Sequence, residues 1–365
     1  MLRLYRTAEF LASMRTLAVM AALLVACKSS NSDSSPPPPL PSAAPAPAKP
    51  KDPMVLANLA VDDSGSGPSD IAVDSSNVYV TEQDWKSEED LPTKVISIPL
   101  QGGSPKVLAS KQHAGQSVVA TKNGLFWIVA GSGDKTFQGS VVKLPLAGGR
   151  WTPVAKAFVA SNAALVADDE YLYFGDMVSD DGVLFKMPIS GGKREQIAKT
   201  GVQDLSALAV DKTNAYWVSI NTIMKTPLSG GPAVELVKTY GSKGNIWGMA
   251  SDGTYLYWTD RNNPTGNEAP TGAAVRRVAI TGGPVESIAT GLPGRPWGIA
   301  VDSTHVYWVI NAERASSIMQ ISKAGGSASV LVAGQNSPAH LALDSNYVYW
   351  CNGGDGKVAR VPKET

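Results

Sequence analysis

A ten-residue segment that recurs seven times is the feature that most constrains the fold of this chain. Its copy at 299–308 reads Ile-Ala-Val-Asp-Ser-Thr-His-Val-Tyr-Trp, and the other copies span 71–80, 118–127, 165–174, 208–217, 249–258 and 341–350. Self-similarity at a regular period means that one structural unit recurs along the chain, so the repeat decides the architecture.

Each copy has the composition of a tight β-hairpin. A short apolar run leads to an Asp, turn-forming residues follow, and a β-branched and aromatic run closes the segment. An Asp at a turn can accept backbone N–H groups two residues on, and Thr121 can do so more weakly in the second copy. The strands read as continuous apolar runs, which predicts that both of their faces are buried.

A second motif, a strand pattern that ends in Gly-Gly, follows six of the seven copies. The glycine pairs stand at 102–103, 148–149, 191–192, 230–231, 282–283 and 325–326. A further short strand, such as 106–109, comes after each pair. Paired glycines supply the positive φ that a two-residue hairpin turn needs, so we expect such a turn here. Each repeat therefore holds four antiparallel strands.

The spacing of the repeats predicts the architecture. The turn positions 74, 121, 168, 211, 252, 302 and 344 are separated by 47, 47, 43, 41, 50 and 42 residues. Four-stranded units at this period are typical of a β-propeller, so we predict an all-β fold of seven blades. The last repeat stops at its third strand, 358–362, and an extra strand stands at 54–57. We expect this N-terminal strand to complete the last blade beside three C-terminal strands, which removes open sheet edges.

The first 27 residues have the pattern of a targeting segment. Arg15 precedes an apolar run at 17–25, which is too short to span a bilayer and suits the core of a signal peptide. The tetrapeptide Leu-Val-Ala-Cys at 24–27 resembles the lipobox of bacterial lipoproteins. The resemblance implies cleavage before Cys27 and a diacylglycerol on its sulfur, and therefore a protein of the cell envelope with a lipid anchor. A simple secretory signal with an incidental cysteine is the alternative.

The rest of the chain divides into a tether and one domain. Residues 28–52 are rich in Ser, Pro and Ala and cannot bury a core, so we expect a disordered, extended tether. Residues 53–365 are long enough for one propeller. Lys and Arg total 32, as do Asp and Glu, and this balance argues against nucleic acid as a partner. If Cys27 is lipidated, Cys351 has no partner, and we expect it to be a small buried hydrophobe.

The loops at one end of the blades are the candidate binding surface. The Asp turns and Gly-Gly turns share the opposite end, whereas these loops vary in length and chemistry. Residues just before the inner strands should surround the ring axis here, which places Trp247 beside Trp297 and His340 beside Asp70. With Gln116, they are our candidate binding residues for a small ligand or peptide. The alternative is that the tryptophans pack between blades and that His340 merely hydrogen-bonds Asp70.

The sequence contains few residues that point to catalysis. Its three histidines are His113, His305 and His340, and it lacks the common zinc-protease, serine-hydrolase and phosphate-loop motifs. We therefore assign no catalytic residue and expect no cofactor or bound metal.

One tetrapeptide carries a family resemblance. Tyr-Trp-Thr-Asp at 257–260 resembles the YWTD repeat of propellers of the low-density-lipoprotein-receptor type, and the weaker copies resemble this group and the NHL-type propellers. The similarity covers 54–365 and implies the propeller fold. Receptor-type YWTD propellers usually have six blades, and only one repeat here keeps the full tetrapeptide.

Similar propeller enzymes, the gluconolactonase and virginiamycin B lyase groups, imply a metal at the ring axis. The corresponding ligands here would be Asp70 and His340, with Asn162 or Asn245.

Two functions remain open at this stage. The first is a membrane-tethered, non-enzymatic binding or scaffold module for a protein, peptide or glycan. The second is a metal-assisted lyase or hydrolase with its site at the ring axis. We favour the first because the catalytic set is sparse, and we expect the protein to be a monomer.

Overall fold

The computed structural model describes most of the region that the sequence assigns to the propeller. The described residues are 49–61, 67–83, 93–112, 115–129, 139–146, 148–156, 164–178, 181–202, 205, 207–220, 222–239, 246–261, 272–313 and 316–364. The chain divides into two compact units, Met1–Ala46 and Pro47–Thr365, and the second holds every described strand. The predicted targeting segment at 1–27 with Cys27, and most of the predicted tether at 28–52, lie outside the described residues. No helix in the described ranges is long and apolar enough to cross a membrane.

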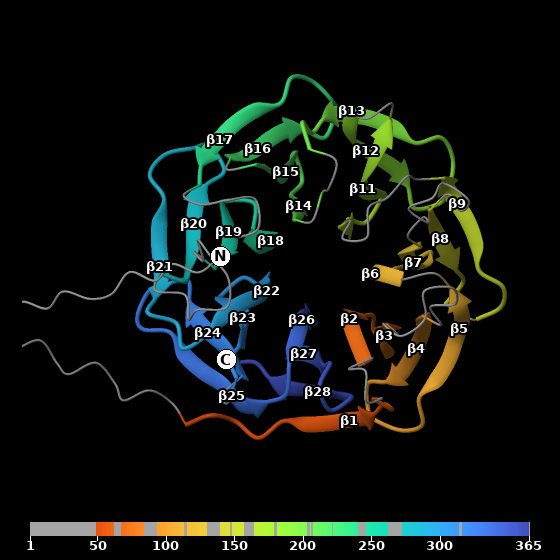
Figure 1. Cartoon of the computed structure of the whole chain (residues 1–365), viewed down its shortest axis with the longest axis vertical. Helices are drawn as coiled ribbons and strands as arrows, with labels where there is room; N and C mark the ends of the chain where they lie inside the picture. The colour runs from red at the N-terminus through yellow and green to blue at the C-terminus, as the bar shows by residue number, and fades with distance from the viewer. Residues whose placement is uncertain are drawn as a thin grey trace, which may run out of the picture. The chain divides into compact units, whose positions relative to one another are not determined.

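The described strands form seven four-stranded antiparallel sheets, which confirms the predicted seven-bladed propeller. Figure 1 shows the sheets standing around a common axis, with one strand of each blade innermost and another at the rim. Blade 1 contains β2 (Gly67–Val73), β3 (Asn77–Gln83), β4 (Thr93–Pro99) and β5 (Lys106–Gln112). Blade 2 contains β6 (Gly115–Thr121), β7 (Gly124–Val129), β8 (Ser140–Leu144) and β9 (Thr152–Lys156). Blade 3 contains β10 (Leu165–Ala167), β11 (Tyr171–Val178), β12 (Asp181–Pro188) and β13 (Glu195–Lys199).

The later blades follow the same order from the axis outwards. Blade 4 contains β14 (Leu208–Val210), β15 (Asn214–Ser219), β16 (Thr222–Pro227) and β17 (Val234–Lys238). Blade 5 contains β18 (Ile246–Ser251), β19 (Tyr255–Asp260), β20 (Ala274–Ala279) and β21 (Glu286–Thr290). Blade 6 contains β22 (Arg295–Val301), β23 (His305–Asn311), β24 (Ser316–Ser322) and β25 (Ser329–Gln335).

Blade 7 is built from both ends of the domain, as the sequence predicts. Its strands are β26 (Pro338–Leu343), β27 (Tyr347–Asn352), β28 (Lys357–Pro362) and, at the rim, β1 (Met54–Asn58). β1 runs antiparallel to β28, with Met54 opposite Arg360 and Asn58 opposite Lys357. Every described strand pairing lies between 54 and 362, so a fragment that begins at Lys49 contains all seven sheets.

The packing between blades buries most of each second strand. All six residues of β7 are buried, and so are the tryptophans at the matching positions of five blades: Trp127, Trp217, Trp258, Trp308 and Trp350. The apolar clusters run from one blade into the next. Tyr216 of blade 4, for example, packs in one cluster with Leu256 and Trp258 of blade 5. Cys351 is also fully buried, in the cluster that joins blades 7 and 1.

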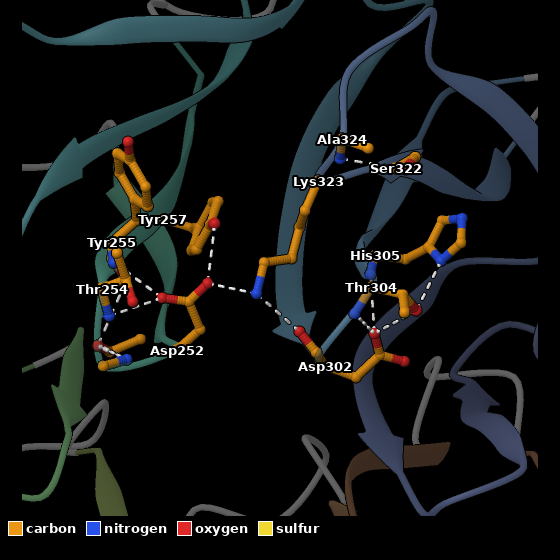
Figure 2. Close-up of polar contacts among 12 residues, drawn as sticks. Asp252, Thr254, Tyr255, Tyr257, Asp302, Thr304, His305, Ser322, Lys323 and Ala324 are labelled. Atoms are coloured by element: carbon orange, nitrogen blue, oxygen red, sulfur yellow. Dashed lines mark hydrogen bonds and ion pairs between the residues drawn. The ribbon is translucent and has the colours of Figure 1, made fainter.

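The Asp turns do more than the sequence predicts. In each of six blades one carboxylate oxygen accepts backbone N–H groups, and the other accepts the hydroxyl of the tyrosine five residues later. Asp252, for example, accepts the N–H of Thr254 at 2.9 Å, the N–H of Tyr255 at 2.8 Å and the Tyr257 hydroxyl at 3.0 Å (Figure 2). The Asp–Tyr pairs are 74–79, 168–173, 211–216, 252–257, 302–307 and 344–349. Each carboxylate thereby fixes its turn to the buried strand that follows.

Blade 2 lacks both partners of this interaction. Thr121 replaces the Asp and accepts the N–H of Asn123 at 3.2 Å, as the sequence predicts. Phe126 stands where the other six blades have tyrosine, so no hydroxyl is left buried without an acceptor. The two replacements are therefore chemically consistent with each other.

The Gly-Gly turns differ from the prediction of a two-residue hairpin. Both glycines of each pair have positive φ, for example 80° at Gly102 and 137° at Gly103. The first glycine closes the turn: the Gly102 N–H donates to the Pro99 carbonyl at 2.9 Å. Six residues separate β4 from β5, so the predicted two-residue turn is wrong. The glycines lead the chain from this wider turn into the outer strand. Their positive φ values would strain any other residue.

Among the described residues, two lysines form ion pairs between neighbouring blades at the end of the ring that carries the Asp turns. Lys323 of blade 6 contacts the Asp252 carboxylate of blade 5 at 2.5 Å (Figure 2). Lys363 of blade 7 contacts Asp302 of blade 6 at 3.0 Å. Burial alone would raise the pKa of Asp302, but the N–H groups of His305 and Thr304 and the Lys363 ammonium together hold it well below its usual value.

The Asp–Tyr pairs predict how the fold responds to alkali. Burial, followed by the hydrogen bond to Asp344, raises the pKa of Tyr349 to about 12, and the pKa values of Tyr79, Tyr173, Tyr216, Tyr257 and Tyr307 are also raised. A raised pKa means that the protonated form is favoured by folding. Its stabilisation is complete below about pH 10 and is lost as the pH rises through the folded-state value.

We therefore expect these tyrosines to ionise only as the propeller unfolds. In an alkaline titration, their tyrosinate absorbance should appear together with the loss of the β-sheet circular dichroism signal. Tyr349→Phe should make unfolding less dependent on pH above pH 10. Ionisation of these buried tyrosines near pH 10 with the sheet signal intact would contradict this interpretation.

Candidate binding site on the loop face

The inner strands begin with β-bulges at the end of the ring opposite the Asp turns, which we call the loop face. The pairing register shifts there in five blades: between Pro68 and Asp70, Gln116 and Val118, Ile246 and Met249, Pro296 and Ile299, and Pro338 and Leu341. The candidate residues thus lie within these strands rather than just before them. Bulges redirect side chains and are common beside functional sites.

Glycine is required at two of these bulges because neighbouring inner strands approach closely. A Cβ atom on Gly248 would lie 2.6 Å from the Trp297 carbonyl oxygen, and one on Gly298 would lie 2.7 Å from that of Ala339. Each glycine directly follows a tryptophan of the candidate site. The Trp-Gly pairs are therefore a sequence signal for the bulges. The pattern of apolar runs alone did not predict these bulges.

Trp247 and Trp297 contact each other across the boundary between blades 5 and 6, as predicted. Their ring centroids are 4.8 Å apart and the rings are inclined by 49°. Arg261, which directly follows β19, places its guanidinium carbon 4.4 Å from the centroid of Trp247 and 3.9 Å from that of Trp297. We call these three residues the Trp–Arg cluster. All three side chains are half-buried, so the cluster combines apolar surface with a positive charge.

Thr259 of the Tyr-Trp-Thr-Asp tetrapeptide hydrogen-bonds the backbone that carries this cluster. The buried Thr259 hydroxyl accepts the N–H of Gly248 at 3.1 Å and donates to the Trp297 carbonyl at 2.7 Å. One side chain thus ties the bulge of blade 5 to the bulge of blade 6. Asp260, which is 3 % exposed, forms an ion pair with Arg276 at 2.8 Å. Arg261 is not among the binding residues that the sequence predicted. Its position directly after this tetrapeptide is the signal that could have indicated it.

The Arg261 guanidinium has little compensation for its burial. Its Nε donates to the Pro296 carbonyl at 3.4 Å, and its buried Nη2 has no hydrogen-bond partner within the described ranges. Among the described residues no carboxylate pairs with it. Burial, and secondarily the charge of Arg295, lower the pKa of Arg261 to about 10, so the side chain is still cationic at neutral pH.

The second predicted pair lies at the boundary between blades 7 and 1. His340 Nδ1 is 3.6 Å from Asp70 Oδ1, which is longer than a hydrogen bond. Asp70 accepts the N–H of Ile71 at 2.9 Å and, from the next blade, the N–H of Val118 at 2.8 Å. Its carboxylate therefore ties β2 to β6, and His340 stands beside it with its side chain 46 % exposed.

The remaining candidate ligands cannot be placed together. Gln116 lies in β6 opposite Ile128, but its side chain is outside the described part of the structure. Asn162, Asn245 and His113 also lie outside the described residues. Within the described ranges no three His, Cys, Asp or Glu side chains are close enough to hold a metal ion.

Comparison with known proteins identifies the fold but no family. No family model and no curated protein sequence matches this chain. The β-propeller domain of the Trilobed protease from Pyrococcus furiosus superposes with a TM-score of 0.56 at 9% identity, covering 78% of this chain and 90% of that one. The computationally designed Ika8 protein gives a TM-score of 0.51 at 16% identity, covering 85% and 99%. A chain of the nidogen/laminin complex gives 0.47 at 19% identity, covering 59% and 82%. These likenesses concern the propeller fold alone.

The two arginines beside Thr259 and Asp260 should respond oppositely to removal of their charge. We expect Arg261→Met to stabilise the fragment 49–365 by about 1 kcal/mol, because a half-buried cation that has no carboxylate partner among the described residues is replaced by an apolar chain of similar length. We expect Arg276→Met to destabilise it by about 3 kcal/mol, because the buried Asp260 carboxylate loses its ion pair with Arg276. Urea denaturation measures both changes. A loss of stability in Arg261→Met as large as in Arg276→Met would show that Arg261 is a structural residue.

Proposed function

We propose that this protein is a lipid-anchored lipoprotein of the bacterial cell envelope whose propeller is a non-enzymatic binding or scaffold module. Its ligand is a protein, peptide or glycan that contacts the loop face at the Trp–Arg cluster. The observation that carries the proposal is the pairing of Trp247 and Trp297 around the guanidinium of Arg261, which has no carboxylate partner among the described residues.

The composition of the cluster supports a binding role. Trp and Arg are enriched among the residues that contribute most to binding energy, because they combine large apolar area with directed hydrogen-bond donors. A half-buried cation for which the described residues supply no carboxylate opposes folding, and an acceptor on a ligand would offset that cost. The bulged backbone around Trp247 and Trp297 is fixed by Thr259, so the two rings are held in place before a ligand binds.

The position of the N-terminal segment is consistent with a tether. Lys51 donates its backbone N–H to the Leu331 carbonyl of blade 6 at 2.8 Å, and its ammonium to the Pro362 carbonyl at 3.0 Å. The chain therefore joins the ring at the rim, near the end that carries the Asp turns, and leaves the Trp–Arg cluster unobstructed by these residues.

The lipid anchor is tested by its cysteine. Cys27→Ser removes the thiol that would carry the lipid, so the full chain should lose incorporation of radiolabelled palmitate and move from the membrane fraction to the soluble fraction in a bacterial host. Cys351→Ser serves as the matched control and should keep both labelling and membrane attachment. Palmitate labelling that survives Cys27→Ser would contradict the anchor.

The binding role is tested by screening the fragment 49–365 against a phage-displayed peptide library and a glycan array. Ligands recovered in either screen should bind Trp247→Ala and Arg261→Gln at least about tenfold more weakly than the unmodified fragment. Trp151→Ala and Arg150→Gln make the same changes beside β9, at the other end of the ring, and should bind normally. Ligands that bind all four variants equally would contradict a site at the Trp–Arg cluster.

A further inference from the structure

We propose a second binding site, between blades 4 and 5, for a small zwitterion of the class of free α-amino acids with an apolar side chain. A cavity of about 490 Å³ lies between the rim strand β17 and blade 5. Its walls include Glu235, Lys238 and Thr239 on one side, and Trp258, Arg276 and Val285 on the other. The volume is in the range of known small-molecule sites. This site is independent of the Trp–Arg cluster and of the function proposed for it.

The indole of Trp258 provides the first indication of a ligand. In two other blades the tryptophan at this position donates to a residue at the end of the preceding blade's rim strand. Trp217 donates to the Thr200 carbonyl at 3.1 Å, and Trp350 donates to the Gln335 side chain at 2.8 Å. Trp258 is 1% exposed, yet no described residue accepts a hydrogen bond from its Nε1.

The position equivalent to the residue that accepts the Trp217 N–H lies in the wall of the cavity. Thr239 directly follows β17, as Thr200 directly follows β13, and it lines the cavity together with Trp258. By analogy with Trp217, the indole N–H of Trp258 is directed toward this wall. A buried donor without an acceptor costs stability, and a ligand carboxylate oxygen in the cavity would supply the missing acceptor.

The charges on the walls match both ends of a zwitterion. Arg276 forms an ion pair with Asp260 at 2.8 Å and donates to Ser287 at 2.6 Å, so these two opposite charges largely neutralise each other. Glu235 and Lys238 also line the cavity, and neither forms an ion pair within the described residues. A ligand carboxylate would meet the Lys238 ammonium and the Trp258 N–H, and its ammonium would meet Glu235.

Two valines in the cavity wall can contact the apolar part of the ligand. Val237 and Val285 are half-buried and line the same cavity from opposite blades. They offer a surface of limited size, which suits an aliphatic side chain. We therefore take L-leucine as the probe. Two analogues separate its charges: 4-methylpentanoic acid lacks the amino group, and isopentylamine lacks the carboxylate.

The titration is followed by the indole N–H signals in ¹⁵N nuclear magnetic resonance spectra of the fragment 49–365. The Trp258 signal is assigned by its loss in Trp258→Phe. L-Leucine should shift it saturably, 4-methylpentanoic acid should bind about tenfold more weakly, and isopentylamine should leave it unmoved. Trp308 is the internal control. Its Nε1 is also buried with no acceptor in the described part of the chain, but Trp308 does not line the cavity.

Variants at the rim distinguish the two charge contacts. Lys238→Gln should weaken L-leucine binding about tenfold or more, and Glu235→Gln should weaken L-leucine but not 4-methylpentanoic acid. Lys199→Gln removes the same charge from the last position of β13 in blade 3 and should bind normally. A Trp258 signal that L-leucine does not move would overturn the proposal, as would a shift that Lys238→Gln leaves unchanged. Either result leaves the Trp–Arg cluster untouched, because its own tests use other ligands and variants.

Discussion

The burial of both faces of every sheet is the constraint on which the whole structure depends. The middle strands are apolar on both sides, and tryptophans such as Trp217 and Trp308 are fully buried. A single blade could cover neither of its faces, so each blade needs a neighbour on both sides. An open row of blades would leave two bare faces at its ends. Only closure into a ring covers all of them, which explains why β1 is placed in the blade formed by the C-terminal strands.

Repetition made the fold predictable from sequence, because the same hairpin signals occur seven times and errors in one copy are corrected by the others. The number of blades, the four strands of each and the shared last blade all followed from spacing and from the incomplete ends. The Gly-Gly connection was misjudged because glycine pairs fit several turns, and only the length of the strands decides between them. The tyrosine hydroxyl bound to each turn Asp was missed, although an Asp and a Tyr five residues apart recur six times.

The candidate site was predictable only in part. The adjacency of Trp247 and Trp297 followed from ring geometry, because equivalent positions of neighbouring blades must lie side by side. The place of Arg261 could not be derived, because it depends on bulges that tilt the strand ends and on a hydroxyl bridge through Thr259. Irregularities of this kind arise from close contacts between blades, which a repeat pattern averages out. At these irregular positions the blades differ from one another, so the surfaces that they form there have distinct chemistry.

Ring closure by the two ends of the chain is the central claim, and a disulfide across the final strand pair tests it most directly. Asn58 and Lys357 are exposed and stand opposite each other in β1 and β28. In a chain that carries Cys27→Ser, we expect Asn58→Cys and Lys357→Cys together to form an intramolecular disulfide under mild oxidation and to raise the urea midpoint. Free thiols that persist in this double variant, or a disulfide that forms equally well when Lys199→Cys replaces Asn58→Cys, would contradict closure.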